Sequence, residues 1–494
     1  MLSGRWVATV QFVGRTDELK ALEGLYAKDR FQLAVIYGRR RVGKTALISR
    51  FCEGKRALMF TAREQSDTEN LRDFSQIVYS FFNFPQTTGI FGNWQDALDF
   101  VAHQAKLDRT QPFVFVFDEF PYAAQSQKSL PSTLQIAIDH QFADTNVTMI
   151  LCGSNEGFME SEVLGSKSPL YGRRNAQIQL QPFDLFDAVQ LMPGNASWED
   201  SINYYAALGG TPYYLLQLND GDTYAQNLER LCYTTSGILY SEPEMLMRQE
   251  LREPAMYNSL LNAIGAGRNT PTLIGDQVGI ERTSVSGYLR TLESLGIVER
   301  KVPFGQNPST SKKGLWRFKD PFFAYWYRFV GPTTGLIERG LSRSAATHGT
   351  QGGAFTTFVG QQFEEMCMQW IVRQCRAGRM DFLPTEIGKW WGNDPVAREQ
   401  TDIDIVMADS INERMLLGEC KWRNSVNETE AIATLKARAD LVKSHYAKRF
   451  MLFTKHPVNA TLRDQADGDE SLMLVDAEHM FFGFLQSAVT FSSR

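Results

Sequence analysis

The chain has 494 residues, of which 43% are apolar, and a formal net charge of −5 at pH 7. This length predicts about three globular domains, each with its own apolar core. No apolar run reaches the roughly 18 residues that a membrane-spanning helix requires, and the start of the chain, MLSGR, lacks the apolar core of a signal peptide. We therefore expect a cytoplasmic protein that has no membrane partner.

The cysteines and the charge exclude two further classes of protein. The six cysteines are scattered and no pair has CxxC spacing, so the sequence indicates neither a disulfide framework nor a zinc site. The negative net charge excludes a protein that is basic over its whole surface. DNA binding needs only a basic patch on one face, which must be found locally.

A phosphate-binding loop is predicted near the N-terminus. Residues 33–37 are an apolar run typical of a buried strand of a parallel sheet, and residues 46–51 begin a helical pattern. The segment between them reads Gly38-Arg39-Arg40-Arg41-Val42-Gly43-Lys44-Thr45. Its glycines let the backbone wrap a phosphate, Lys44 reaches the β- and γ-phosphates, and the Thr45 hydroxyl is a ligand for Mg²⁺. We therefore expect a nucleoside triphosphate, ATP, to bind here with Mg²⁺.

A second apolar strand pattern, at residues 113–117, ends in Asp118 and Glu119 and is typical of a Walker B strand. Parallel sheets bind ligands at the carboxyl ends of their strands, so we expect Asp118 beside the Mg²⁺ held by Thr45. Glu119 is then placed to orient or deprotonate the attacking water. The simpler interpretation is a buried strand closed by a solvated acidic turn.

Four further segments resemble motifs of the archaeal-type P-loop ATPases in the AAA+/STAND group. Residues 12–19 read FVGRTDEL, residues 153–155 read GSN after an apolar strand pattern, residues 168–174 read SPLYGRR and residues 208–214 read LGGTPYY. Three of these segments also have simpler interpretations, as a helix cap, a solvated basic turn and a helix break.

The resemblance implies a role for each segment. Residues 12–19 lie against the adenine, and Ser154 or Asn155 contacts the γ-phosphate or the attacking water. Arg173, with Arg174 as the fallback, stabilises the charge that develops in phosphoryl transfer, either within one chain or from a neighbouring copy. In the fourth segment, Pro212 belongs to a helical lid and meets the nucleotide.

A DNA-binding module is predicted after the lid. Helical patterns at residues 256–264, 272–278 and 283–295 precede a β-ribbon at residues 296–302 and 315–318, which is the outline of a winged helix. The third helix of such a module enters the major groove, so the candidate contacts are Arg282, Thr283, Ser284, Ser286, Tyr288 and Arg290. Residues 254–320 hold nine Lys or Arg against five Asp or Glu, which favours DNA. A packing or protein-contact module is the alternative.

The last domain contains a second set of candidate catalytic residues. Residues 401–406 and 415–422 alternate as two strands, and neighbouring strands would bring Asp404, Glu419 and Lys421 together. Two carboxylates hold Mg²⁺, and a nearby lysine positions water or stabilises the anionic phosphorane, which is the chemistry of metal-assisted phosphodiester hydrolysis. The simpler interpretation is a set of solvated charges on an edge strand.

This pattern resembles the PD-(D/E)XK, or restriction-endonuclease-like, superfamily. Glu419-Cys420-Lys421 matches E-x-K, and Glu364 matches the helix glutamate of the "GxxFE" start, although the proline before Asp404 is absent. Archaeal-type ATPases with a winged helix and such a C-terminal domain form a known family, and the resemblance extends from Phe12 to about Val475. It implies that Glu364, Asp404 and Glu419 are metal ligands.

The sequence thus predicts an α/β chain in five parts. These are an AAA+-type P-loop core with a parallel sheet at residues 1–183, a helical lid at 184–252, a winged helix at 253–330, a Gly/Ser/Thr-rich linker at 331–355 and a restriction-endonuclease-like α/β/α domain at 356–494. We expect an ATPase that binds duplex DNA through its last two folded parts and cleaves it; a homo-oligomer is compatible with the sequence. The alternative is a STAND-type regulatory ATPase that switches protein interactions and has a non-cleaving terminal scaffold.

Overall fold

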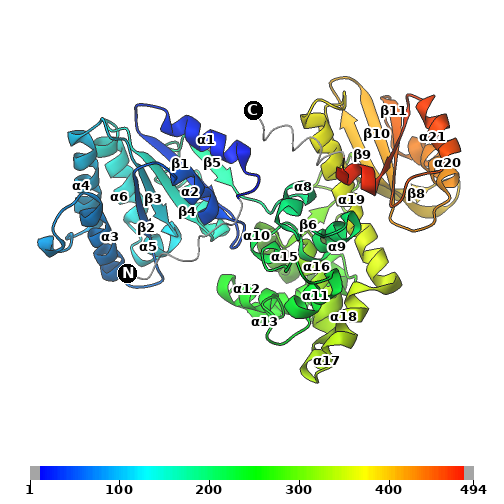
Figure 1. Ribbon diagram of the computed structural model, residues 1–494, viewed down its shortest axis with the longest axis horizontal. Helices are drawn as coiled ribbons and strands as arrows, with labels where there is room; N and C mark the ends of the chain where they lie inside the picture. Colours follow the sequence, from blue (N-terminus) through cyan, green and yellow to red (C-terminus); the bar gives the residue numbers. More distant parts are fainter. Residues whose placement is uncertain (1–11, 483–494) are drawn as a thin grey trace. The chain divides into compact units, whose positions relative to one another are not determined.

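The structure is a computed structural model that describes residues 12–482. The chain divides into two compact units between Pro182 and Phe183 (Figure 1). The first unit is an α/β domain, and the second combines helices with a two-stranded ribbon and a second sheet. The outer ends of the predicted domains 1–183 and 356–494 lie outside the described residues.

The first unit contains a five-stranded parallel sheet with the order β2-β3-β4-β1-β5. Its strands are β1 (Gln32–Tyr37), β2 (Ala57–Thr61), β3 (Val114–Asp118), β4 (Thr148–Gly153) and β5 (Ala176–Gln179). Every residue of β1 and β4 is buried, which explains their unbroken apolar sequences. Since β4 lies between β1 and β3, the carboxyl ends of these three strands are neighbours at one edge of the sheet.

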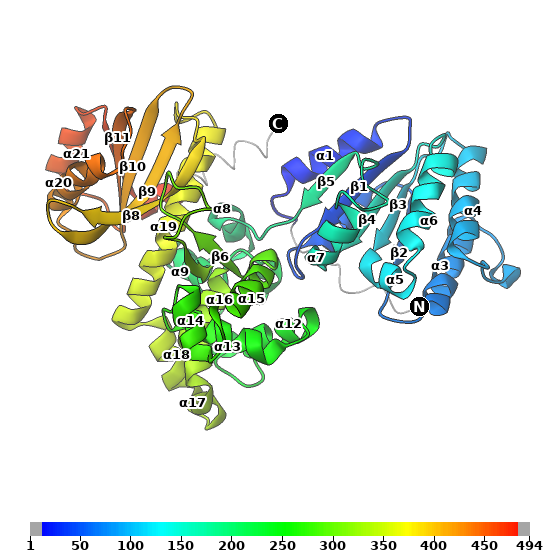
Figure 2. The ribbon, with the colours of Figure 1, turned by 180° about the vertical axis from the view of Figure 1, so that it is seen from behind.

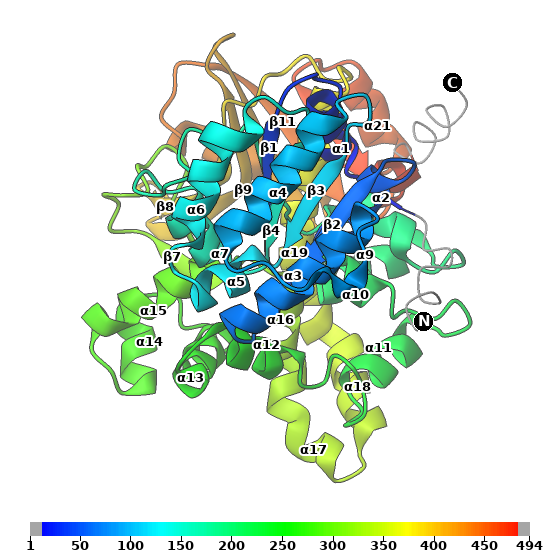
Figure 3. The ribbon, with the colours of Figure 1, turned by 90° about the vertical axis from the view of Figure 1, so that its left-hand side faces the viewer.

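Helices cover both faces of this sheet (Figure 3). They are α1 (Thr16–Tyr26), α2 (Lys44–Cys52), α3 (Asp67–Phe81), α4 (Trp94–Leu107), α5 (Phe120–Ser126), α6 (Leu130–Ala137) and α7 (Glu156–Phe158). Alternate residues of β1 point to opposite faces. Val35 belongs to the core under α3, α4 and α6, whereas Ile36 belongs to the core under α1 and α2.

The second unit begins with helices and a ribbon. The helices are α8 (Leu185–Ala188), α9 (Trp198–Leu208), α10 (Pro212–Leu215), α11 (Tyr224–Cys232), α12 (Glu242–Glu250), α13 (Pro254–Gly265), α14 (Pro271–Val278) and α15 (Arg282–Ser294). Strands β6 (Val298–Lys301) and β7 (Leu315–Phe318) then pair antiparallel. Three helices and a ribbon therefore lie where the sequence predicts them. The aromatic segment at residues 322–330 is buried in the core of this unit, as its bulk suggests.

The predicted linker at residues 331–355 is wrong, because this stretch is helical and partly buried. It forms α17 (Thr334–Glu338), α18 (Ser342–Thr350) and the start of α19 (Gly352–Arg376), after the short helix α16 (Pro321–Tyr325). On α18, Ala345, Ala346 and Gly349 are buried. A Cβ atom at Gly349 would lie 1.8 Å from the Tyr233 hydroxyl oxygen, so the small residues here permit close packing rather than flexibility.

The C-terminal sheet is mixed and has the order β12-β11-β10-β9-β8. Its strands are β8 (Glu386–Asp394), β9 (Glu399–Asp409), β10 (Arg414–Lys421), β11 (Ala447–Thr454) and β12 (Leu472–Asp476), and its later helices are α20 (Glu428–Arg438) and α21 (Ala460–Asp467). The first three strands are antiparallel, and β10, β11 and β12 are parallel. Helix α19 packs on one face, and α20 packs on the other (Figure 2). Among residues 12–482, no helix combines the length and apolarity needed to cross a membrane.

Candidate functional site

The loop after β1 has the backbone of a phosphate cradle. Gly38 has φ 146°, and a Cβ atom there would lie 2.4 Å from the carbonyl oxygen of Leu180. Arg41 (φ 73°) and Gly43 (φ 94°) adopt left-handed conformations, and Gly43 is the N-cap of α2. Left-handed residues in such a loop turn successive N–H groups toward one point, and the N-terminus of α2 adds its partial positive charge.

The Lys44 side chain is buried inside this loop. Its Nζ donates hydrogen bonds to the carbonyl oxygens of Gly38 (2.7 Å) and Arg39 (3.0 Å). Burial lowers the pKa of Lys44, whereas the carboxylates of Glu119 and Asp118 act in the opposite direction. The two carboxylates therefore stabilise the charged form of the lysine. Thr45 follows it in the first turn of α2 and is exposed.

The FVGR segment is attached to the same loop. The Arg15 guanidinium donates to the carbonyl oxygens of Val42 (3.1 Å) and Gln181 (2.6 Å) and forms an ion pair with Glu18. Because Val42 belongs to the loop and Gln181 follows β5, Arg15 joins the entry and exit of the first unit to its phosphate cradle.

The acidic end of β3 and the polar end of β4 are in contact. Glu119 has φ 49°, and its carboxylate accepts hydrogen bonds from the Ser154 hydroxyl at 2.9 and 3.0 Å and from the Ser154 N–H at 3.3 Å. Asp118 accepts a hydrogen bond from the Glu119 N–H (3.0 Å). Asn155, in contrast, caps α7 by accepting the Phe158 N–H (2.9 Å). Ser154 therefore contacts the acid and Asn155 caps a helix; a contact of either residue with the γ-phosphate or the attacking water stays a prediction.

Arg173 and Arg174 have partners within their own part of the first unit. Arg173 forms a two-pronged ion pair with Asp139, at 2.8 and 2.7 Å, and donates to the Pro169 carbonyl. The hydrogen bond from Arg173 lowers the pKa of Asp139. Arg174 donates to the Leu164 carbonyl (3.3 Å). A role for either arginine toward phosphate stays a prediction.

Pro212 lies in the second unit, at the first turn of α10. The preceding Gly210 contacts the chain entry to this unit, because the Phe183 N–H donates to its carbonyl oxygen (2.8 Å). A Cβ atom at Gly210 would lie 1.7 Å from the Phe183 carbonyl oxygen, so close packing alone explains why this position is glycine. A contact between Pro212 and nucleotide stays a prediction.

The C-terminal candidates gather where β9 and β10 meet α19. Asp404, on β9, accepts the Cys420 N–H of β10 at 3.0 Å. Glu419 and Lys421 form an ion pair at 2.5 Å. Burial and then the Asp404 charge raise the pKa of Glu419, and the same two causes raise the pKa of Glu364, on α19, to about 7. The predicted residues Glu364, Asp404, Glu419 and Lys421 therefore belong to one cluster.

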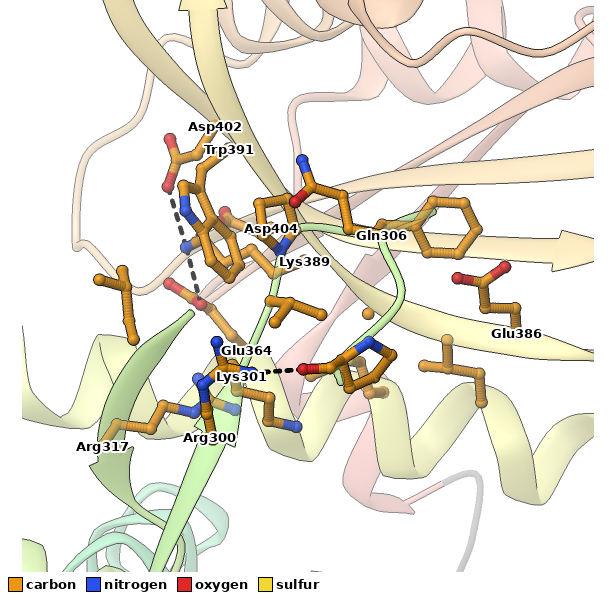
Figure 4. Close-up of a pocket in the computed structure, with 18 of the residues that line it drawn as sticks. Arg300, Lys301, Gln306, Arg317, Glu364, Glu386, Lys389, Trp391, Asp402 and Asp404 are labelled. Atoms are coloured by element: carbon orange, nitrogen blue, oxygen red, sulfur yellow. Dashed lines mark hydrogen bonds and ion pairs between the residues drawn. The ribbon is translucent and has the colours of Figure 1, made fainter. Parts of the chain in front are cut away.

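Lys389, on β8, is a member of this cluster that sequence reasoning missed (Figure 4). Its Nζ lies 2.8 Å from Asp404 Oδ1, 3.0 Å from Glu364 Oε2 and 3.0 Å from Asp402 Oδ2. Burial opposes the charged form, but the three carboxylates outweigh it and raise the pKa of Lys389. The one signal in the sequence was a lysine next to two tryptophans in a strand pattern.

The acid cluster lines a cavity of about 750 Å³. One wall carries Glu364, Asp402, Asp404 and Lys389, and the other comes from β6, β7 and the loop between them, residues 302–314, here named the ribbon loop. Within residues 12–482, no three His, Cys, Asp or Glu side chains are arranged to hold a metal ion. In this conformation the Lys389 ammonium lies among the three carboxylates, and a metal-binding role for Glu364, Asp404 and Glu419 stays a prediction.

The predicted DNA-contacting residues lie on α15. Arg282, Thr283, Ser284 and Arg290 are exposed. Tyr288 instead packs edge-on against Tyr257, and its hydroxyl donates to Glu253 (2.8 Å). The exposed face of α15 is thus polar and carries two arginines, whereas Tyr288 joins α15 to α13.

Comparisons of the sequence with known families match two parts of the chain. Residues 12–218 match a family described as "ATPase domain predominantly from Archaea". Residues 326–432 match a second family, described as "Archaea bacterial proteins of unknown function". The chain is 26% identical over 415 residues to an uncharacterized protein of Methanocaldococcus jannaschii, which covers 84% of this chain and 88% of that protein. It is also 49% identical over 47 residues to an uncharacterized ATP-binding protein of the same organism, which covers 10% of this chain and 80% of that protein.

Among solved structures, the similar ones include a Walker-type ATPase of Pyrococcus abyssi, with a TM-score of 0.49 and 20% identity over 64% of this chain and 96% of that chain. They also include the ORC2 protein of Aeropyrum pernix, with a TM-score of 0.42 and 14% identity over 69% of this chain and 98% of that chain. The family match and the loop geometry agree on the first unit. Over residues 12–218, the chain therefore belongs to the P-loop ATPases found predominantly in Archaea, and over residues 326–432 it carries the domain of unknown function.

Proposed function

We propose that this chain hydrolyses ATP with Mg²⁺, couples hydrolysis to the binding of duplex DNA, and cleaves DNA in its C-terminal domain. The observation that carries the proposal is the grouping of Lys44, Asp118, Glu119 and Ser154 at the carboxyl ends of β1, β3 and β4. These residue types at one edge of a parallel sheet are the ones that phosphoryl transfer requires.

Each of these residues has a separate task in ATP hydrolysis. The N–H groups of residues 38–45 bind the phosphates, and Lys44 exchanges its two carbonyl partners for β- and γ-phosphate oxygens. Thr45 and Asp118 would hold Mg²⁺, which neutralises phosphate charge during transfer. Glu119 orients the attacking water, and Ser154 fixes the direction of the Glu119 carboxylate. Arg173 would stabilise the transition state, and a homo-oligomer would let it do so in a neighbouring chain.

DNA binding is proposed for α13, α14, α15 and the β6–β7 ribbon, which together resemble a winged helix. The support is the exposed arginine pair on α15, Arg282 and Arg290, in a segment with four more basic than acidic residues (nine minus five over residues 254–320). Phosphate contacts need only such a local excess of basic residues, whatever the net charge of the whole chain.

DNA cleavage is proposed for the C-terminal sheet. A helix, three antiparallel strands, a helix and a parallel strand follow one another as α19, β8, β9, β10, α20 and β11, which supports a restriction-endonuclease-like fold. Asp404 and Glu419 are buried neighbours on adjacent strands, and Lys421 pairs with Glu419. Paired buried carboxylates are costly unless a cation accompanies them.

The test of cleavage uses purified protein with plasmid and linear DNA, in Mg²⁺ or Mn²⁺, with and without ATP. The expected result is nicking or cutting that Asp404→Ala and Lys421→Ala each abolish while ATP hydrolysis is unchanged. The control is Lys44→Ala, which should lose ATP hydrolysis. Protein that binds DNA and hydrolyses ATP but never cuts in either metal would contradict the proposal.

That outcome would favour the second candidate, a STAND-type regulatory ATPase whose terminal domain is a scaffold. One observation supports this candidate: Lys389 places a positive charge among the three carboxylates from within the chain, so part of their repulsion is offset without a metal ion. The prediction specific to this candidate is that ATP binding changes the affinity for a partner protein, which pull-down of matched Lys44→Ala and wild-type chains would measure.

A further inference from the structure

Lys389 lies at an irregularity between β8 and β9. Gly388 pairs with Val406 and Trp390 pairs with Ile403, so the single residue Lys389 opposes two residues of β9, Asp404 and Ile405. A bulge of this kind breaks the ladder and redirects side chains. Here it coincides with the approach of the Lys389 ammonium to the Asp404 carboxylate, at 2.8 Å.

The ammonium is held as a divalent cation would be. It lies within 3.0 Å of one oxygen from each of Glu364, Asp402 and Asp404, which belong to α19 and β9. The Glu364 and Asp404 side chains are only 19% and 11% exposed, so their charges are poorly screened by water. Such carboxylates repel one another unless a cation lies between them, and Lys389 supplies it.

The ribbon loop is fastened to the backbone of the same lysine. The Phe304 N–H donates to the Lys389 carbonyl oxygen at 2.9 Å, and the Gly305 N–H donates to the Glu386 carboxylate at 3.0 Å. The Phe304 ring packs against the apolar group under α20 that includes Ile403 and Trp390. Arg300 and Lys301 of the β6 strand line the same cavity as the acid cluster (Figure 4).

The ribbon loop is also joined to the proposed DNA-binding helices. It connects β6 to β7, and Arg300 braces it by donating to the carbonyl oxygens of Pro308 and Ser311. Strand β6 follows α15 and packs against it, and Val298 and Leu292 belong to the same apolar core. A displacement of the ribbon would therefore be transmitted to the Lys389 backbone through its bond to Phe304.

We propose that Lys389 is a built-in counter-cation that competes with a divalent metal ion for Glu364, Asp402 and Asp404, and that the docked ribbon loop holds it in place. The proposal rests on the proposed cleavage function, for which it supplies the regulation. With the loop docked, the acid cluster excludes the metal ion.

The test measures the affinity of the nucleotide-free full-length chain for Mn²⁺. Titration calorimetry gives the affinity directly, and the electron paramagnetic resonance of free Mn²⁺ gives it independently. Lys389→Met removes the charge at similar side-chain length and should tighten Mn²⁺ binding about tenfold or more, equivalent to about 1.4 kcal/mol. The double variant Lys389→Met/Asp404→Ala should lose that gain. Lys389→Arg, which keeps the charge, should behave as wild type, and Phe304→Ala should tighten binding to an intermediate extent.

The matched control is Lys436→Met, which removes a lysine that pairs with Asp469 elsewhere in the same domain. If Lys389→Met binds Mn²⁺ no more tightly than Lys436→Met, the proposal is wrong. If Lys389→Met melts at a lower temperature, Mn²⁺ should raise its Tm more than that of wild type, and a Tm that Mn²⁺ leaves unchanged would overturn the proposal.

The two proposals fail in different ways. Suppose that wild type never cuts DNA but Lys389→Met binds Mn²⁺ more tightly. The cleavage function would then be refuted, and the competition between Lys389 and the metal ion would be supported. Cleavage that is lost in Lys389→Met while Mn²⁺ affinity is unchanged would keep the cleavage function and make Lys389 a participant in the reaction, which contradicts the competing role.

Discussion

The Ser154 hydroxyl donates to both oxygens of the Glu119 carboxylate, at 3.0 and 2.9 Å, and so joins the ends of β4 and β3. The contact fixes the direction of the acid that we expect to act on water. It also keeps that acid at the end of the strand next to β4, whose other neighbour, β1, leads into the phosphate-binding loop. Catalytic groups must be held in a narrow range of positions, so the contact has a measurable consequence.

We predict that Glu119→Gln leaves ATP binding intact and lowers the hydrolysis rate by about 10² or more, because the amide cannot take a proton from water. Ser154 can still donate to the amide oxygen, which preserves the local structure. The measurements are nucleotide affinity and steady-state phosphate release. Loss of binding in this variant would show Glu119 to be structural, and full turnover in Lys44→Ala would refute the assignment of the loop.

Ser154→Ala tests the contact itself. Without the hydroxyl, Glu119 keeps only the longer bond from the N–H of residue 154 (3.3 Å), so its direction is less well fixed, and we expect hydrolysis to fall about tenfold with ATP affinity unchanged. The comparison variant is Asn155→Ala, the next residue, which removes the cap of α7 and leaves the contact between Ser154 and Glu119 in place. Equal rates for Ser154→Ala and wild type would mean that the contact has no part in hydrolysis.

The exposed arginines of α15 lead to a prediction about DNA. Reversing Arg282 and Arg290 to Glu should weaken duplex binding and reduce its salt dependence, because the slope of log K against log salt falls by roughly one unit for each DNA phosphate that the protein no longer neutralises. Binding is measured by fluorescence anisotropy over a series of salt concentrations. Arg343→Glu, on α18, is the control for each single reversal, Arg282→Glu or Arg290→Glu, because it changes the net charge by the same amount; an equal effect there would place the DNA surface elsewhere.

The ion pair between Arg173 and Asp139 predicts a pH dependence of stability. Arg173 lowers the pKa of Asp139 in the folded chain below the value of about 3.9 expected when the chain is unfolded. The pair therefore stabilises the first unit above about pH 4, and its contribution is lost as the pH falls through the lower, folded pKa. Between about pH 5 and pH 3, wild type should lose more stability than Asp139→Asn, as followed by chemical unfolding. Parallel losses would mean that the pair contributes nothing.

The parts of the fold that follow from local sequence could be predicted. The loop from Gly38 to Thr45, the acids after β3 and the helices before the ribbon depend on short-range turn chemistry and on hydrophobic period, which the sequence displays directly. The contact of Ser154 with Glu119 could not be predicted, since it depends on which side chain faces β3 after the strands have paired.

Lys389 was missed for a related reason. Its place in the acid cluster depends on the irregular pairing of β8 with β9 and on the approach of α19, and no local pattern in residues 386–394 encodes either. Register is set by the whole sheet, so a single lysine among apolar strand residues has the same appearance whether it faces water or three carboxylates. The sequence predicted Asp404 and Glu364 as members of the site, but it did not predict the lysine that lies between them.

The predicted linker failed because glycine, serine and threonine were taken as signs of flexibility. In α18 they provide close packing instead, which gives the last prediction. Gly349→Ala would place a Cβ atom 1.8 Å from the Tyr233 hydroxyl, which is itself hydrogen-bonded to Tyr325 at 2.9 Å in the core, so neither tyrosine can move without breaking that bond. We expect the second unit to lose about 1–3 kcal/mol of unfolding free energy through overpacking.

Gly353→Ala, in α19, is the control. Its Cβ atom meets no atom within 4 Å, and the change should be neutral or stabilising by up to about 1 kcal/mol, since alanine favours helix. Chemical unfolding of the two variants measures the difference, and equal stabilities would mean that α18 is not packed as the structure describes.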